Sequence, residues 1–189
     1  MRGREHRPPG RRINVVGTTG SGKTTVARAI AERLDVPYIE LDALFWKPDW
    51  GETPDDEFLP KVDAATCGDR WVLDGNYSRT RPIVWPRADM IVWLDYPFPR
   101  VFLQLLRRTI SRAITKEAMW DGCVETWRKG FFSRDSILLW CLQTYWRRRR
   151  NYPGVFNRPE HRHLRVVRLR SPRETAGWLA RLDCSQERG

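Results

Sequence analysis

The chain has 189 residues, of which 41% are hydrophobic and 30% charged, a balance that suits one globular domain folding without disulfide or metal support. Its 34 Lys and Arg residues outnumber 23 Asp and Glu residues, and the formal net charge of +11 attracts nucleotides, nucleic acids and acidic membrane surfaces alike. The four cysteines stand far apart without a CxxC pair, and no apolar run is long enough to span a membrane. We therefore exclude a disulfide scaffold, a zinc cluster and a membrane protein, and we expect a cytoplasmic protein with reduced thiols.

The predicted elements alternate between strands and helices. Residues 1–11 are rich in Arg, Pro and Gly, which predicts a flexible basic tail. Residues 13–16 form a short run with β-branched residues that ends at Gly17, and apolar residues at helical spacing follow over 26–34. The later predicted strands are 38–41, 71–73, 90–94 and 164–169, and the later predicted helices include 54–65, 99–114 and 133–149. A last helix is predicted to start after Ser171, with Ser171 as its N-cap, Pro172 at the first helical position and Glu174 at the capping-box position.

This alternation predicts an α/β fold in which parallel strands are joined by right-handed crossovers and helices cover both faces of the sheet. We expect one domain over residues 12–182 and a short tail over 183–189. The segment of about 115–155 between the fourth and fifth strands has no strand pattern, so we expect it to be a helical lid insertion. Its tryptophans are expected to pack against the body of the domain; they are Trp120, Trp127, Trp140 and Trp146.

A phosphate-binding loop stands between the first strand and the first helix. The segment Gly17-Thr18-Thr19-Gly20-Ser21-Gly22-Lys23-Thr24 matches the Walker A pattern GxxxxGK[ST]. Glycines let backbone N–H groups converge on phosphate oxygens, Lys23 neutralises β- and γ-phosphate charge, and the Thr24 hydroxyl suits magnesium. The predicted cofactors are ATP and Mg²⁺. The residues expected to bind the nucleotide are Gly17, Thr18, Thr19, Gly20, Ser21, Gly22, Lys23, Thr24 and Thr25.

A second feature of the site is a carboxylate at the end of a neighbouring strand. Magnesium bound with a triphosphate needs an acidic residue near its water shell, and Asp74 closes the predicted strand 71–73. We predict Thr24 and Asp74 as the magnesium residues. The alternative is that Asp74 only caps a turn before Gly75.

The segment WVLDGNYSRTR resembles the LDGFPR segment of adenylate kinases, and the element order over most of residues 12–182 is similar to that of nucleoside monophosphate kinases and shikimate kinases. The combination of ELDALFW, WVLDGNYS, LLRRTISR and SRDSILLW is also similar to bacterial adenylate-kinase-like proteins of the DNA topology modulation type. This resemblance implies a three-layer P-loop NTPase fold with a five-stranded parallel sheet of order 2-3-1-4-5. It also implies a mobile lid after the fourth strand.

The resemblance places further residues at the site. Asp42, two residues after Glu40, stands where shikimate kinases have an Asp-x-Asp that engages acceptor and metal, which makes it a candidate general base or acceptor anchor. The alternative is a cap of the following helix or turn. The acceptor-phosphate arginine of adenylate kinases falls loosely on Arg79 or Arg81.

Arginines from the lid side are implied to stabilise the charge of the transferred phosphate. The candidate catalytic set is Lys23, Asp42, Arg107, Arg108 and Arg134, and Arg112 with one or two members of the run Arg147, Arg148, Arg149 and Arg150 are further lid candidates. Trp46, Trp50 and Trp85 either line an acceptor pocket or belong to the core.

These features together predict a kinase that transfers the γ-phosphate of ATP to a small acceptor, a nucleotide or another hydroxylated metabolite. We expect a monomer or homodimer. The alternative is a nucleic-acid-associated P-loop ATPase or regulator, which the net charge and the basic tail suggest. It is less favoured because the sequence contains no recognised nucleic-acid-binding module.

Overall fold

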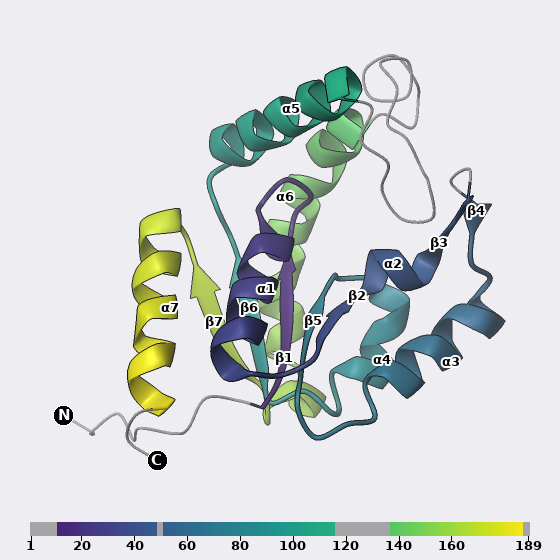
Figure 1. Cartoon of the computed structure of the whole chain (residues 1–189), viewed down its shortest axis with the longest axis vertical. Helices are drawn as coiled ribbons and strands as arrows, with labels where there is room; N and C mark the ends of the chain where they lie inside the picture. Colours follow the sequence, from purple (N-terminus) through teal and green to yellow (C-terminus); the bar gives the residue numbers. More distant parts are fainter. Residues whose placement is uncertain (1–10, 49–50, 116–136, 187–189) are drawn as a thin grey trace.

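The computed structural model of the chain describes residues 11–48, 51–115 and 137–186, and its centre is a five-stranded sheet (Figure 1). The strands are β1 (Arg12–Gly17), β2 (Tyr38–Glu40), β5 (Trp71–Asp74), β6 (Met90–Leu94) and β7 (Arg165–Leu169). Their order is β2-β5-β1-β6-β7, and all neighbours pair in parallel. Counted in chain order, these strands give 2-3-1-4-5, which confirms the predicted strand order and α/β fold class.

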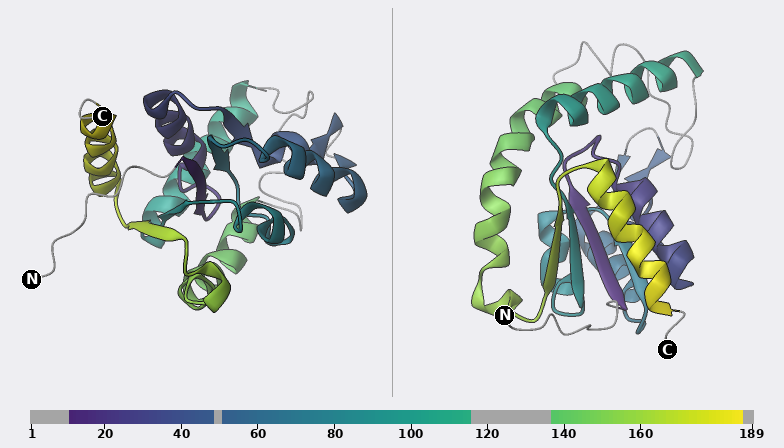
Figure 2. Two further views of the ribbon diagram at one scale, coloured as in Figure 1. Left: turned by 90° about the horizontal axis from the view of Figure 1, so that it is seen from below. Right: turned by 90° about the vertical axis from the view of Figure 1, so that its left-hand side faces the viewer.

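Helices cover both faces of the sheet (Figure 2). Helices α1 (Lys23–Leu34) and α7 (Pro172–Gln186) pack on one face, where Ile13 and Val15 meet Ile30 and Leu182. Helices α3 (Asp55–Ala65), α4 (Arg81–Val84) and the second half of α6 (Ile137–Phe156) pack on the other face. Because both faces are covered, β5 and β6 are buried along their whole length, and they read as continuous rather than alternating apolar runs.

Helix α5 (Phe98–Thr115) crosses above the carboxyl ends of the strands, and α6 returns along the sheet (Figure 1). Cys141, Tyr145 and Tyr152 of α6 are buried, so residues 137–155 of the predicted lid belong to the body of the domain. Trp140 and Trp146 are 47% and 50% exposed, so neither is a core residue, although the Trp146 ring stacks on Phe98 of α5 with the ring centres 6.1 Å apart. The helical repeat explains their exposure, because it places both outside the α6 face that carries Cys141 and Tyr145. Trp120 and Trp127 lie outside the described residues.

Short elements follow β2 that the sequence analysis did not predict. Leu41 begins helix α2 (Leu41–Phe45) instead of ending a strand, because Leu41 and Phe45 are four residues apart and bury on one side of a helical turn. A small antiparallel hairpin comes next, formed by β3 (Trp46–Lys47) and β4 (Gly51–Glu52). Trp85 is a core residue at 2% exposure and Trp46 is half-buried, whereas Trp50 lies outside the described residues.

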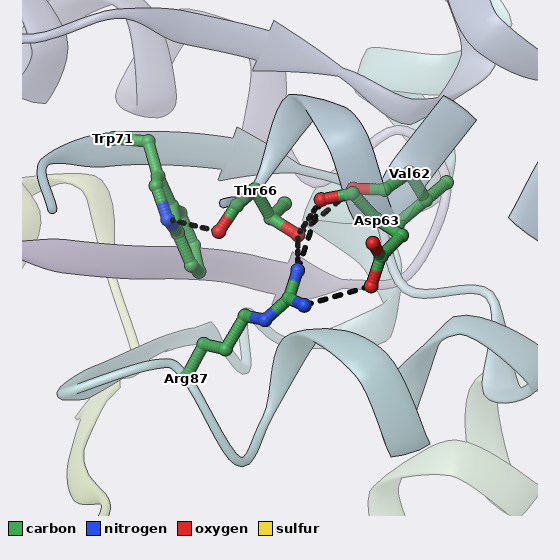
Figure 3. Close-up of polar contacts among 5 residues, drawn as sticks. All are labelled: Val62, Asp63, Thr66, Trp71 and Arg87. Carbon is green, nitrogen blue, oxygen red and sulfur yellow. Dashed lines mark hydrogen bonds and ion pairs between the residues drawn. The ribbon is translucent and has the colours of Figure 1, made fainter. Parts of the chain in front are cut away.

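A polar cluster ties the end of α3 to its neighbours (Figure 3). Arg87 donates to the Asp63 carbonyl at 2.9 Å and to the Thr66 hydroxyl at 3.1 Å, and it pairs with the Asp63 carboxylate at 2.7 Å. The Trp71 indole donates to the Thr66 carbonyl at 3.2 Å. Carbonyl groups in the last turn of a helix have no partner within the helix, and these side chains supply partners for them.

The start of α7 was predicted correctly. The Ser171 hydroxyl accepts the Glu174 N–H at 3.1 Å, as an N-cap should. The Glu174 carboxylate reaches back to the N–H of Arg170 at 2.7 Å, one residue before the cap. The helix runs to Gln186, beyond the domain boundary expected at residue 182. Within the ranges that the structure describes, no helix is long and apolar enough to cross a membrane.

Candidate active site

The phosphate loop leaves the end of β1 at Gly17 and enters α1 at Lys23, at the carboxyl edge of the sheet. Gly20 and Gly22 have φ angles of 80° and 85°, and the Ser21 N–H donates to the Thr18 carbonyl at 3.1 Å. Gly22 is the N-cap of α1 and no side chain caps this helix end. The first N–H groups of α1 therefore remain available to an anion, with the positive end of the helix behind them.

Several elements hold this loop in place. A Cβ atom at Gly20 would lie 2.7 Å from the Cβ of Leu105, so α5 rests directly on the loop. The Asn76 amide donates to the Gly17 carbonyl at 2.9 Å, and the Cys141 thiol of α6 contacts the Thr19 carbonyl at 3.9 Å. The loop is therefore fixed from three sides before any ligand binds.

Lys23 lies half-buried at the mouth of the loop. Its ammonium donates only to the Thr18 carbonyl at 3.5 Å, and within the described ranges no carboxylate reaches it at ion-pair distance. Burial lowers the pKa of Lys23, while the charges of Asp74 and Asp42 oppose this shift. A phosphate group at this position would restore the favourable electrostatic partner that the buried ammonium lacks.

Asp74 has the surroundings that a magnesium site requires. It is 5% exposed, and its Oδ2 atom accepts the Thr24 hydroxyl at 2.5 Å and the Tyr38 hydroxyl at 3.4 Å. Its Oδ1 atom is buried and has no hydrogen-bond partner in the described part of the chain. Among residues 11–48, 51–115 and 137–186, no backbone N–H bonds this carboxylate, so the geometry does not fit the alternative of a turn cap. An orphaned carboxylate oxygen beside a threonine hydroxyl fits the oxygen ligands of Mg²⁺ and its water shell.

Asp42 lies in the first turn of α2 and faces the same site. Its Oδ1 atom accepts the Tyr77 hydroxyl at 2.6 Å, and it caps neither α2 nor a turn. Burial lowers the pKa of Lys23 and raises that of Asp74; the negative charge of Asp42 opposes the first shift and adds to the second, which reflects its closeness to both residues. Burial, and then the charge of Asp42, raise the pKa of Tyr77, so the tyrosine stays protonated as a donor to Asp42.

The predicted arginines have different surroundings. Arg108 of α5 and Arg148 of α6 are half-buried, and their charges lower the pKa of Lys23. Burial lowers the pKa of Arg148 itself. Arg107 is exposed, and Arg134 lies outside the described residues.

The other arginine candidates also differ in their surroundings. In the run after Trp146, Arg149 pairs with Asp95 at 3.3 Å, and the first and last members are exposed. Arg79 pairs with Asp55 at 2.8 Å and stacks over Phe45, so it braces α3. Arg81 stacks over Trp85. Burial is the main cause of the lowered pKa of Arg148, and the charge of Arg81 adds to it, so Arg81 lies near Arg148.

Three residues of the site escaped the sequence analysis. Asn76 links the loop to α6, because its amide also donates a hydrogen bond to the Tyr152 hydroxyl at 2.7 Å. Tyr77 orients Asp42, and Cys141 packs against the loop. Asn76 and Tyr77 directly follow the Asp-Gly segment, which was the one local signal for them; nothing local points from Cys141 to a loop 122 residues away.

Comparisons with known proteins find similarity to an ATPase family and to kinases. Residues 13–56 match the family described as "ATPase family associated with various cellular activities (AAA)". The chain is 36% identical over 89 residues to the "Putative adenylate kinase" of Pyrococcus furiosus, which covers 43% of this chain and 47% of that protein. It is 28% identical over 134 residues to the "Shikimate kinase" of Synechococcus elongatus, covering 57% of this chain and 67% of that one. The match to the Pyrococcus protein thus spans about half of its length.

Solved structures show the same fold. A shikimate kinase from Bacteroides thetaiotaomicron superposes with a TM-score of 0.57 at 17% identity, over 95% of this chain and 99% of that chain. A gluconokinase from Sinorhizobium meliloti gives 0.50 at 21% identity, over 96% and 98%. The phosphate loop, the strand order and the relatives support the P-loop adenylate kinase-like and shikimate kinase-like superfamily, which confirms that part of the resemblance, whereas the likeness to DNA topology modulation proteins stays a prediction.

Proposed function

We propose that this protein is an ATP-dependent phosphotransferase that moves the γ-phosphate to a small acceptor, a nucleotide or a nucleoside-like metabolite. The observation that carries the proposal is the grouping of Lys23, Asp74 and Asp42 at one edge of the sheet, in front of a helix end that no side chain caps. Lys23 suits a triphosphate, Asp74 suits its magnesium and Asp42 suits an acceptor.

The triphosphate would be held by the backbone N–H groups of the loop and by Lys23. Thr24 and Asp74 would hold the magnesium, which supplies positive charge to the phosphate oxygens when it is bound. Arg108 and Arg148 would stabilise the charge that develops on the transferred group, because both lie close enough to affect the pKa of Lys23. Most of the rate enhancement would come from positioning and electrostatics.

Asp42 would act on the acceptor. Tyr77 holds its Oδ1 atom, and no other described residue bonds this carboxylate. An acceptor oxygen would attack the γ-phosphorus while the bond to the ADP oxygen breaks; where the acceptor is a hydroxyl, Asp42 would take its proton, and where it is the phosphate of a nucleotide, the attacking oxygen is already ionised and needs no base. Arg148 is close enough to act on Lys23 and Arg81 is close enough to act on Arg148, and these cations favour an acceptor that carries an anionic group, such as a nucleotide or a sugar acid.

The test is a screen of pure protein with Mg-ATP and a panel of nucleoside monophosphates, nucleosides and sugar acids. ADP release and the mass of the product are followed together, because ADP without a phosphorylated product would be hydrolysis only. The Lys23→Ala variant is the control, with its fold checked by circular dichroism. We expect at least one acceptor to be phosphorylated by the wild type and none by the variant; turnover retained by the variant would refute the role of the loop.

A further inference from the structure

A cavity separate from the candidate active site lies on the α6 face of the sheet, beside the edge strand β7. It has a volume of about 500 Å³, and its lining includes Trp93, Phe156, His161, Arg162, Val166 and Arg168. None of its lining residues belongs to the phosphate loop or to the candidate active site. The volume is within the range of small-molecule sites in proteins, about 300–1,000 Å³.

The ionisable side chains that line this cavity are all basic. Two arginines and one histidine line it, and no Asp or Glu does. The Arg162 side chain is exposed and forms no ion pair within the described parts of the chain. Such a lining favours an anion over a neutral or cationic ligand.

Arg168 is fixed in position before any ligand binds. Its Nε atom donates to Asp95 at 2.9 Å, its Nη2 atom donates to the same oxygen, and its guanidinium lies 4.5 Å from the centre of the Trp93 ring. The Nη1 atom has no bond to any described residue. Asp95 also pairs with Arg149, so one carboxylate is shared by two guanidinium groups and a net positive charge remains. A preorganised guanidinium with a spare donor edge is well suited to a phosphate or carboxylate.

The remaining wall of the cavity is apolar and partly aromatic. Phe156 is the half-buried ring of this wall; Trp93, which is 4% exposed, supports it from behind with the ring centres 5.7 Å apart, and Val166 on β7 is 37% exposed. Aromatic walls of this kind bind planar rings. The cavity therefore offers a surface for a ring next to donors for an anion.

We propose that this cavity is a second ligand site, which binds a small anion carrying a planar aromatic ring, with Arg162 and Arg168 on the anionic group and Phe156 and Val166 on the ring. The site shares no residue with the phosphate loop, so its occupancy can be measured while the loop is filled. Its existence does not depend on the proposed phosphoryl transfer.

The probe for this site is 1-naphthyl phosphate, titrated by calorimetry into the 189-residue chain with and without a saturating magnesium complex of a non-hydrolysable ATP analogue. We expect one binding event that persists when the analogue is present. Inorganic phosphate, which lacks the ring, should bind at least about tenfold more weakly. Arg162→Glu should weaken naphthyl phosphate binding by about tenfold or more, because it replaces a charge-assisted hydrogen bond with a repulsion.

Two further variants separate a built site from general charge attraction. Arg165→Glu makes the same charge change on β7, one residue before Val166 and on the opposite face of the sheet, and should change the affinity by less than about twofold. Val166→Trp fills the cavity from an exposed position and should weaken binding as Arg162→Glu does. The proposal is overturned if the wild type does not bind the probe, if Arg165→Glu and Arg162→Glu reduce affinity equally, or if Arg162→Glu and Val166→Trp leave it unchanged.

Discussion

Asp74 is a carboxylate with one oxygen in use and the other unsatisfied in a buried position. Leaving such an atom without a partner costs on the order of 1–3 kcal/mol, so folded proteins rarely contain one without a reason. Thr24 lies beside it and supplies the hydroxyl that a magnesium site in this loop needs. The protein without a ligand therefore has an unfavourable contribution to its folding free energy at Asp74, which a bound metal would remove.

The pH dependence of magnesium binding follows from Asp74. Burial raises its pKa above the ordinary value for aspartate, although Lys23 opposes the shift. The metal needs the ionised carboxylate, so the magnesium-dependent gain in ATP affinity should be lost as the pH falls through this raised pKa, earlier than for an exposed aspartate. Without a ligand the sign is opposite: protonated Asp74 favours the folded chain at low pH, and this contribution disappears as the pH rises through the folded-state pKa.

Calorimetry of ATP binding with and without magnesium, from about pH 5 to pH 8, measures this dependence. The Asp74→Asn variant is the reference, because it retains the titration of ATP itself. We expect the variant to show little magnesium enhancement at any pH. An enhancement equal to that of the wild type at neutral pH would remove Asp74 from the metal site.

Asp42 is predicted to act on transfer and not on ATP binding. Asp42→Asn keeps the shape of the side chain but removes the base, so turnover of a hydroxyl acceptor should fall by about 10²–10⁴-fold while the Mg-ATP dissociation constant changes by less than about threefold. Tyr77→Phe leaves the carboxylate but frees its orientation, and should cause a smaller loss. Single-turnover kinetics and equilibrium binding separate the two effects, and an unchanged rate in Asp42→Asn would contradict the assignment.

At the scale of elements, the turn after β5 decides how the site is assembled. Gly75 has a φ of 133°, and a Cβ atom there would lie 2.8 Å from the Cβ of Leu41 at the start of α2. The same turn presents Asp74 on one side and Asn76 on the other. Only glycine allows the chain to turn here while α2 packs close enough to bring Asp42 to the site.

Gly75→Ala is therefore expected to destabilise the fold by about 2 kcal/mol or more, which corresponds to a decrease in Tm of roughly 4–8 °C in a chain of this size. Gly68→Ala is the matched control, because Gly68 is exposed and its added methyl would contact nothing within 4 Å. Thermal unfolding followed by circular dichroism compares the two variants. Equal Tm values for both would show that the turn tolerates a side chain.

The order of elements could be predicted from the sequence because the long helices carry apolar residues at helical spacing and the strands are short apolar runs between them. The phosphate loop could be predicted because its glycines, Lys23 and Thr24 lie within one contiguous motif. Asp74 could be predicted because parallel strands end at one edge of the sheet. The short helix α2 and the hairpin β3–β4 could not, because they are too short to show a repeating pattern and depend on tertiary packing.

Contacts that span long stretches of sequence also escaped prediction. The bond from Tyr77 to Asp42 joins residues 35 apart, and Cys141 reaches the loop from α6. In the run of arginines after Trp146, the composition alone could not separate Arg148, which faces the loop, from its neighbours. The helical turn makes that choice once Cys141, Tyr145 and Tyr152 fix which face of α6 is buried.

At the scale of the whole molecule, the net charge of +11 will attract nucleic acid whatever the function is. We expect duplex DNA binding to be salt-labile, falling by at least about a hundredfold between 50 and 200 mM salt. We also expect DNA to leave the rate of ATP turnover unchanged. Binding that persists at the higher salt together with DNA-stimulated turnover would favour the nucleic-acid-associated ATPase instead.

The central claim is that the loop from Gly17 to Thr24 grips a magnesium-bound triphosphate. Calorimetric titration of the purified, folded protein with Mg-ATP tests it most directly, with Lys23→Ala as the paired sample. The account predicts one nucleotide per chain and a loss of affinity of at least about tenfold in the variant, because Lys23 supplies a buried charge-assisted contact. No heat of binding in the wild type, or equal affinity in both proteins, would contradict it.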